Sequence, residues 1–144
     1  MIQIDQLHFS IHSTPILQNL TFTLNAGEIV GFVGNNGAGK TTTLEILSQC
    51  IVPTSGNITC NGKDIWTADD YRRSMGYVPD QLPLYPNATV RENLVYAAEL
   101  RQVTSPNVRV DELLEEFHLS TVSRSPIRTL SKGWRQWTGI AQAW

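Results

Sequence analysis

A glycine-rich stretch at residues 34–42 carries the clearest chemistry in the sequence. It reads G-N-N-G-A-G-K-T-T and matches the pattern G-x-x-x-x-G-K-S/T. Glycines allow the backbone to curl into a nest in which several N–H groups point at one anion. Lys40 adds a cation for phosphoryl oxygens, and the hydroxyl of Thr41 is the kind of oxygen ligand that Mg²⁺ prefers. The stretch therefore predicts a site for the phosphates of a nucleotide.

This predicted phosphate loop supplies a continuous set of candidate site residues. It is preceded by a short apolar run at residues 28–33, which predicts a strand buried on both faces. It is followed by residues 40–50, where Leu44 and Leu47 recur at helical spacing and predict a helix. The positive end of that helix adds to the anion site. The candidate nucleotide-binding residues are Gly34, Asn35, Asn36, Gly37, Ala38, Gly39, Lys40, Thr41 and Thr42.

The elements around the loop are predicted to be strands early in the chain and helices late. Apolar residues alternate with period two in residues 2–9 and 20–24, which indicates half-buried strands. Turn signals flank a hairpin-like element at residues 55–62. The remaining expected elements are a strand at 75–78, a loop at 80–88, and helices at 69–74, 89–101, 110–119 and 131–144. This order predicts an α/β core that is followed by a helical region.

Two of the predicted helices carry specific signals. The helix at 89–101 begins with Thr89 and Glu92 at the spacing of a capping box. The helix at 131–144 gathers large apolar residues on one side, and we interpret this stripe as core-facing rather than as a binding platform. The stripe consists of Trp134, Trp137, Ile140, Ala141 and Trp144.

The composition excludes several classes of protein. The chain has 144 residues, of which 41% are hydrophobic, and its net charge is -2 at pH 7. These values fit one globular domain and exclude disordered or collagen-like chains. The acidic balance argues against nucleic-acid binding, and no apolar run approaches the roughly 20 residues of a bilayer span. The N-terminus lacks the basic start of a signal peptide. Cys50 and Cys60 are predicted to be reduced packing residues rather than a disulfide or metal pair.

A second motif indicates a family. Residues 130–136 read L-S-K-G-W-R-Q at the start of the last predicted helix and resemble the LSGGQ signature of ATP-binding-cassette (ABC) ATPases. The loop at 34–42 resembles that family's version, GxNGAGKTT. Residues 75–80 resemble the strand that leads into its Q-loop, and residues 84–92 resemble the start of its helical subdomain. The motifs occur in the family's order, and the resemblance is greatest to ATPase subunits of bacterial ABC-2-type exporters.

The resemblance implies a fold and an organisation. We expect an α/β P-loop NTPase of the ABC type, with N-terminal β-strands and the phosphate-loop core at residues 1–80. The Q-loop and helical subdomain would occupy residues 81–130, and the signature motif and the start of its helix residues 131–144. The implied function is that of an ATP-binding subunit that couples ATP binding and hydrolysis to transport, as export, through a separate membrane subunit. A second ATP-binding subunit would complete each ATP site, and no nucleic acid would be a partner. The protein would lie in the cytoplasm, at the inner face of the cell membrane.

The resemblance also implies roles for individual residues. Lys40 would bind the β- and γ-phosphates of ATP, and Thr41 would ligate Mg²⁺. Asp80 occupies the position of the Q-loop glutamine, which in the family contacts Mg²⁺ and the attacking water. The carboxylate oxygen of an aspartate can also ligate Mg²⁺. A shift of one residue, which would place Gln81 there, remains open. Ser131 would reach the γ-phosphate bound by the second subunit.

The sequence departs from the family pattern at the adenine and signature positions. Ile11 aligns with the ring that stacks on adenine in the family, and Phe9 or His12 are the alternatives. In the signature, Lys132 replaces a glycine and adds positive charge, while Trp134 replaces a glutamine. The serine, the second glycine and the helix N-terminus are retained, so the anion-binding chemistry of the motif is retained as well.

The last departure concerns the Walker B strand, which in the family follows the signature and carries a metal-ordering Asp and a catalytic Glu. The sequence ends at Trp144 without it. We therefore expect the front part of an ABC ATPase, truncated before Walker B, that does not turn over ATP by itself. Two other functions stay open: a fragment that binds nucleotide or a partner without turnover, and a non-transport ABC ATPase acting on DNA or ribosomes.

Overall fold

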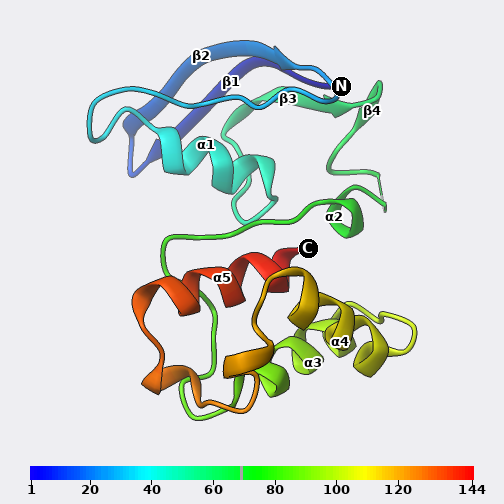
Figure 1. Ribbon diagram of the computed structural model, residues 1–144. Helices are drawn as coiled ribbons and strands as arrows, with labels where there is room; N and C mark the ends of the chain where they lie inside the picture. Colours follow the sequence, from blue (N-terminus) through cyan, green and yellow to red (C-terminus); the bar gives the residue numbers. More distant parts are fainter. Residues whose placement is uncertain (69) are drawn as a thin grey trace. The chain divides into compact units, whose positions relative to one another are not determined.

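A long β-hairpin begins the chain. The computed structural model describes residues 1–68 and 70–144, which divide into two units, Met1–Met75 and Gly76–Trp144, each described by itself. In the first unit, β1 (Ile2–Ile11) pairs antiparallel with β2 (Thr14–Leu24) (Figure 1). The alternation of core-facing residues is interrupted by register shifts, so that Ile4 and Leu7 face the core three residues apart. The period-two stretches in the sequence predicted both strands, but the second strand begins at Thr14 rather than at residue 20.

Two shorter strands complete the sheet. β3 (Ser55–Cys60) pairs antiparallel with β1, and the two-residue β4 (Lys63–Asp64) pairs with β3, which gives the order β2-β1-β3-β4. Asn61 and Gly62 turn the chain between β3 and β4 with positive φ of 50° and 78°. Asn and Gly tolerate this conformation best, which explains the turn. The predicted hairpin-like element is confirmed.

One helix packs on the sheet of the first unit. α1 (Lys40–Leu47) lies below the strands in Figure 1 and buries Thr43, Ile46 and Leu47. The helix predicted from the spacing of Leu44 and Leu47 is confirmed, and Leu44 is 42% exposed. The side chains that α1 buries against the sheet are those of Thr43, Ile46 and Leu47. The core of this unit consists of Ile4, Leu7, Leu17, Ile46, Leu47, Ile58, Ile65 and Tyr71.

A buried tyrosine closes the far end of α1. Tyr71 starts the short helix α2 (Tyr71–Ser74), and its hydroxyl donates a hydrogen bond to the carbonyl oxygen of Leu47 at 2.8 Å. Burial is the main cause that raises the pKa of Tyr71 to about 12. The sequence predicted a helix at 69–74; residue 69 lies outside the described residues, and the structure confirms the helix from Tyr71.

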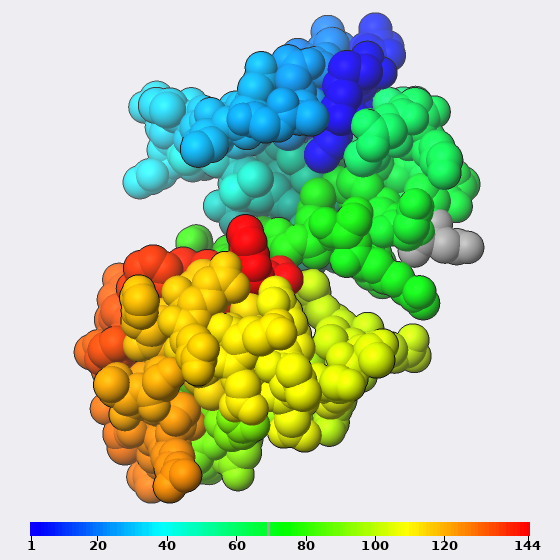
Figure 2. Space-filling view, turned by 45° about the vertical axis from the view of Figure 1, so that its right-hand side comes forward, coloured from blue at the N-terminus to red at the C-terminus, as the bar shows by residue number. Residues whose placement is uncertain are grey.

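The predicted buried strand at residues 28–33 does not form. The described structure assigns no strand there, Ile29 and Val33 are 103% and 97% exposed, and the segment lies at the surface (Figure 2). A strand needs a neighbour with which to exchange main-chain hydrogen bonds. β1 already pairs on both sides, with β2 and β3, and no described strand pairs with this segment. The strand predicted at 75–78 is absent for the same reason.

The second unit is helical. It contains α3 (Val90–Leu100), α4 (Pro106–Glu116) and α5 (Lys132–Ala143), with single 3₁₀ turns η1 (Ser120–Val122) and η2 (Ile127–Thr129) between α4 and α5. α4 begins four residues before the predicted start at 110, because the first helical position accepts proline readily. The core consists of Val90, Leu94, Ala98, Val110, Leu114, Leu119, Ile127, Leu130 and Ala141.

The tryptophan stripe of α5 is only partly in this core. Trp134 packs against the core cluster, as predicted. Trp137 and Trp144 are 51% and 70% exposed and rest against the ring of Phe117, with centroids 6.2 and 6.1 Å away. The helix buries the small residues Thr138, Gly139 and Ala141 instead. The prediction of a core-facing stripe is therefore wrong for Trp137 and Trp144.

The two cysteines have different surroundings. Cys50 and Cys60 are free thiols in the structure. Cys60 packs against the core of the first unit, as predicted, but Cys50 is exposed and has no packing role. Across the described residues, every helix is too short or too polar to traverse a lipid bilayer.

Main-chain hydrogen bonds join two segments of the second unit. Residues 86–91, at the start of α3, run beside residues 123–128, which precede the signature motif. The four bonds run from Val90 N to Ser125 O (3.2 Å), Arg91 N to Ser123 O (3.0 Å), Ile127 N to Ala88 O (2.9 Å) and Arg128 N to Pro86 O (2.9 Å). We call this pairing the main-chain seam. It fixes η2 and the start of α5 relative to the start of α3.

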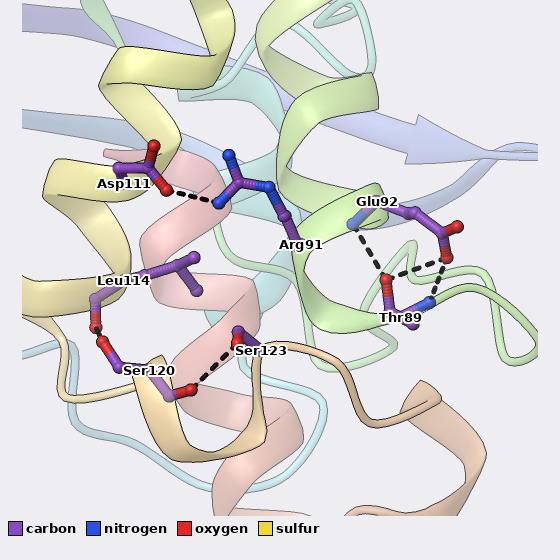
Figure 3. A network of polar contacts seen from close by, with 7 residues as sticks. All are labelled: Thr89, Arg91, Glu92, Asp111, Leu114, Ser120 and Ser123. Carbon is purple, nitrogen blue, oxygen red and sulfur yellow. Dashed lines mark hydrogen bonds and ion pairs between the residues drawn. The ribbon is translucent and has the colours of Figure 1, made fainter.

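The predicted capping box at the start of α3 is present beside the seam (Figure 3). The Glu92 N–H donates to the Thr89 hydroxyl oxygen at 3.2 Å, and the Thr89 N–H donates to the Glu92 carboxylate at 2.7 Å. These bonds to the carboxylate lower the pKa of Glu92. The box satisfies N–H groups that the first turn of a helix otherwise leaves without partners.

Replacing the capping hydroxyl should destabilise the second unit. We expect Thr89→Ala to lower the free energy of unfolding by about 1 kcal/mol, as measured by urea denaturation at neutral pH. Because the folded pKa of Glu92 is lowered, its contribution is present above the ordinary glutamate pKa and is lost as pH falls through the folded value. Thr104→Ala, at an exposed position, is the control. Equal stability of the two variants would contradict the capping role.

Candidate nucleotide-binding site

The glycine loop forms a nest in front of α1. Gly37 and Gly39 have φ of 83° and 82°, which only glycine adopts without strain. The N–H of Ala38 donates to the carbonyl oxygen of Asn35 at 3.1 Å, which closes a tight turn. Gly39 is the N-cap of α1, and no side chain caps the helix. The N–H groups of the first turn are therefore left for an anion.

Close contact with β2 seats the loop. A Cβ atom on Gly39 would lie 2.3 Å from Cδ2 of Leu17 and 3.3 Å from the carbonyl oxygen of Ile16. The buried hydroxyl of Thr43 donates to the carbonyl oxygen of Gly39 at 2.9 Å and holds the same residue from the helix side. The hairpin therefore determines where the positive end of α1 begins.

The ammonium group of Lys40 lies at the mouth of the loop. Its Nζ donates to the carbonyl oxygens of Gly34 at 2.9 Å and Asn35 at 2.8 Å. These are neutral acceptors, and phosphoryl oxygens form stronger, charge-assisted bonds. The lysine is thus held beside the nest by contacts that an anionic ligand would outcompete.

A cavity of about 400 Å³ opens at this loop. Its lining contains most of the predicted loop residues and one residue that the sequence analysis missed, Ile16 on β2. Nothing in the spacing of the sequence links Ile16 to the glycine loop, because the link is a tertiary contact. Ile11, predicted at the adenine position, is 50% exposed at the end of β1 and is not part of this lining. The lining residues are Ile16, Asn36, Gly37, Gly39, Lys40, Thr41 and Thr42.

The other candidate site residues belong to the second unit. Asp80 is exposed and lines a cavity of about 470 Å³ together with Lys132 and Arg135. Ser131 is the N-cap of α5, and its hydroxyl oxygen accepts a weak hydrogen bond of 3.4 Å from the N–H of Trp134. Within this unit, Ser131 therefore stands at the positive end of a 12-residue helix, as the motif predicted.

Comparison with known proteins defines the class. Residues 17–144 match the family model described as "ABC transporter". The chain is 31% identical to a solved "ATP binding subunit of ABC transporter", with a TM-score of 0.83 over 99% of this chain and 61% of that chain. The chain therefore belongs to the ABC transporter family, and its fold is the P-loop NTPase fold of ABC ATPases, as the sequence predicted.

Relatives show how much of the family's length is present. The chain is 34% identical over 145 residues to the lipopolysaccharide export system ATP-binding protein LptB of Haemophilus influenzae. The match covers 96% of this chain and 60% of LptB. It is 36% identical over 130 residues to ATP-binding cassette sub-family A member 2 of Rattus norvegicus, covering 88% of this chain and 5% of that protein.

The seating of the loop on β2 is directly testable. We expect Gly39→Ala to lower the free energy of unfolding by about 2–4 kcal/mol, because it adds left-handed backbone strain to a clash with Leu17. Gly31→Ala is the matched control: a Cβ there meets nothing within 4 Å, so the change should stay within about 0.5 kcal/mol. Thermal and urea unfolding of both variants give the comparison. Similar losses in both would rule out the close approach as the cause.

Proposed function

We propose that the protein is the ATP-binding subunit of an ABC transporter and couples ATP binding and hydrolysis to export through a separate membrane subunit. The observation that carries this proposal is the uncapped N-terminus of α1 behind a glycine nest, with Lys40 at its mouth, in a chain of the ABC family. A nest and a helix N-terminus together favour a multiply charged anion such as a triphosphate.

ATP binding would use the loop residues in distinct ways. The N–H groups of Gly37 to Lys40 would hold the β-phosphate. The ammonium group of Lys40 would give up its hydrogen bonds to the carbonyl oxygens of Gly34 and Asn35 and bind the β- and γ-phosphates instead. Ile16 offers apolar surface within the cavity, and Ile11 stays the proposed contact for adenine. Mg²⁺, when bound, would neutralise charge on the phosphates. Its protein ligands would be the exposed hydroxyl of Thr41 and the carboxylate of Asp80.

The second unit would serve a partner copy and the membrane subunit. Ser131, at the positive end of α5, would contact the γ-phosphate held by a second ATP-binding subunit. In this proposal residues 1–80 bind the nucleotide, residues 81–130 contain the partner-binding region, and residues 131–144 carry the signature. The protein would act in the cytoplasm at the inner face of the cell membrane.

An aromatic cavity in this unit supports the membrane-subunit assignment. It has a volume of about 310 Å³, and its lining includes Tyr77, Leu82, Tyr85 and Tyr96. Tyr85 and Tyr96 are 53% and 44% exposed and meet edge to face, with ring centroids 5.1 Å apart. Partly exposed aromatic rings with a polar end are the side chains most enriched at protein interfaces. We assign residues 80–91 and this cavity to the contact with the membrane subunit.

A buried amide keeps the aromatic cavity in shape. Asn93 is 3% exposed, and its Oδ1 accepts from the N–H of Tyr85 at 2.8 Å. Its Nδ2 donates to the carbonyl oxygens of Tyr85 at 3.3 Å and Thr89 at 2.9 Å. The backbone at Tyr85 is thus tied to α3 from both sides, so the aromatic surface is ordered before any partner arrives.

Removing the loop cation tests the proposed nucleotide site. We expect Lys40→Ala to weaken ATP binding by about 1.5–3 kcal/mol, or roughly 10- to 150-fold. Titration of the purified chain with a fluorescent ATP analogue measures this. Lys63→Ala, which removes an exposed lysine on β4, should bind ATP normally. Unchanged affinity in Lys40→Ala would refute the phosphate-loop assignment.

The two candidate Q-loop residues make different predictions. In a protein of the relatives' full length, assembled with its membrane subunit, Asp80→Ala should reduce the stimulated ATP turnover more than the basal turnover. If the register is shifted by one residue, Gln81→Ala should show the larger loss instead. Steady-state ATPase rates with and without the membrane subunit separate the two. Full retention of stimulated turnover in both variants would remove the metal and coupling roles from this position.

A further inference from the structure

Two asparagines of the chain are followed directly by glycine. These pairs are Asn36–Gly37 in the glycine loop and Asn61–Gly62 in the turn between β3 and β4. An asparagine is chemically labile in this setting, because the backbone nitrogen of the next residue can attack its side-chain amide carbon. Glycine hinders this attack least, since it has no side chain and the freest backbone. The two pairs share this chemistry and differ in their surroundings.

The amide group of Asn36 is free to react. Asn36 is exposed, and within residues 1–68 and 70–144 its side chain forms no hydrogen bond. The N–H of Gly37 likewise has no main-chain acceptor among the described residues, and a Cβ atom on this glycine would meet nothing within 4 Å. The turn that contains both residues is closed by the bond from Ala38 N to Asn35 O. A short exposed turn of this kind opens more often than paired strands do.

The amide group of Asn61 is held in place instead. Its turn is flanked by Cys60 and Lys63, which are partners in the ladder between β3 and β4. The N–H of Asn61 donates to the carbonyl oxygen of Met1 at 2.8 Å, and its Oδ1 accepts from the amino group of Met1 at 2.9 Å. Attack by the nitrogen of Gly62 would require the turn and these bonds to open. Asn61 therefore provides an internal reference with the same dipeptide and a slower expected reaction.

The reactive pair lies in the cavity that we assign to the phosphates of ATP. Asn36 and Gly37 line this cavity together with Lys40. The nitrogen of Gly37 is both the atom that would attack and one of the N–H groups assigned to the β-phosphate. A nitrogen whose N–H donates to a phosphoryl oxygen is held in the nest and cannot turn toward the side chain of Asn36. An occupied site should therefore be protected, and an empty site should react.

We propose that Asn36 is a site of intramolecular deamidation, which bound nucleotide suppresses and which inactivates an empty glycine loop. The reaction needs only water and hydroxide. The suppression by nucleotide and the inactivation rest on the proposed function, whereas the reaction itself does not. The glycine loop would thus record how long the protein has been without its ligand.

The reaction balances without any oxidant or reductant. Hydroxide removes the proton from the nitrogen of Gly37, and this nitrogen forms a bond to Cγ of Asn36. The bond between Cγ and Nδ2 breaks, and Nδ2 takes a proton from water and leaves as ammonia, which closes a cyclic imide. Water then opens the imide at either carbonyl group, leaving aspartate or isoaspartate at position 36. One water is consumed and one ammonia is released.

Either product would disable the nest. Aspartate places a carboxylate beside the N–H groups that the phosphates require, and like charges a few ångströms apart repel each other. Isoaspartate carries the same charge and also adds a methylene group to the main chain, which moves the N–H of Gly37. Both products would therefore weaken the binding of a multiply charged anion.

Peptide mapping by mass spectrometry tests the reaction on the purified chain. During incubation in mildly alkaline buffer, Asn36 should convert several times faster than Asn61, and peptides with aspartate and with isoaspartate should appear together. ATP with Mg²⁺, at about ten times its Kd, should slow conversion of Asn36 about tenfold. It should leave conversion of Asn61 unchanged. Adenosine, which has no phosphate, should protect neither asparagine.

Variants connect the reaction to ATP binding. In Asn36→Gln the imide would need one more methylene group, so this variant should keep through the incubation the ATP affinity with which it starts. Asn61→Gln is the matched control and should lose ATP affinity at the rate of the unmodified sequence. Asn36→Asp, made directly, should bind ATP about tenfold more weakly than the fresh chain. Titration with a fluorescent ATP analogue before and after incubation gives these values.

Each contrary result overturns a stated part. Conversion of Asn36 no faster than that of Asn61 would overturn the reactive site. Equal loss of ATP affinity in Asn36→Gln and Asn61→Gln, or normal ATP binding by Asn36→Asp, would overturn the inactivation. Absence of protection in a chain that binds ATP would overturn the suppression. Rapid conversion of Asn36 in a chain that does not bind ATP would confirm the reaction and overturn the proposed function, together with the suppression.

Discussion

The first unit depends on the contact between Gly39 and Leu17. No side chain fits between this residue and β2, so the hairpin can press directly on the start of α1. The contact sets where the first-turn N–H groups point, and Thr43 secures the same residue from within the helix. The position of Lys40 follows, because it is the next residue in the chain. A long hairpin far from the glycine motif in sequence is therefore part of the anion site.

The second unit depends on hydrogen bonds rather than on a close approach. Asn93 and the capping box order the start of α3, and the main-chain seam passes that order to η2 and α5. The apolar core beneath is formed by residues from all three helices. Leu82 lines both the aromatic cavity and the cavity that contains Asp80, Lys132 and Arg135. Both surfaces thus take their shape from a small number of satisfied polar groups.

Local signals in the sequence predicted local structure well. Period-two alternation identified β1 and β2, the Asn-Gly pair the β3–β4 turn, and the Thr89–Glu92 spacing the capping box, because each of these depends on neighbours in the chain. Features that depend on distant partners were not predictable in this way. Residues 28–33 have the composition of a buried strand but no described partner, and Ile16 joins the loop cavity only through the fold. The helical period placed Trp137 and Trp144 in the core, whereas their rings contact Phe117 and stay exposed.

The main-chain seam has a mechanical consequence. Its four hydrogen bonds contribute about 0.5–1.5 kcal/mol each, so separating residues 86–91 from residues 123–128 would cost roughly 2–6 kcal/mol. The two segments therefore move together as one rigid body. Ser131 lies three residues beyond Arg128, and Tyr85 directly precedes Pro86, so both lie at the same end of the seam, where Arg128 and Pro86 are bonded. Any displacement of the loop at Tyr85 therefore moves the segment that leads into Ser131 by way of the bond between Arg128 and Pro86.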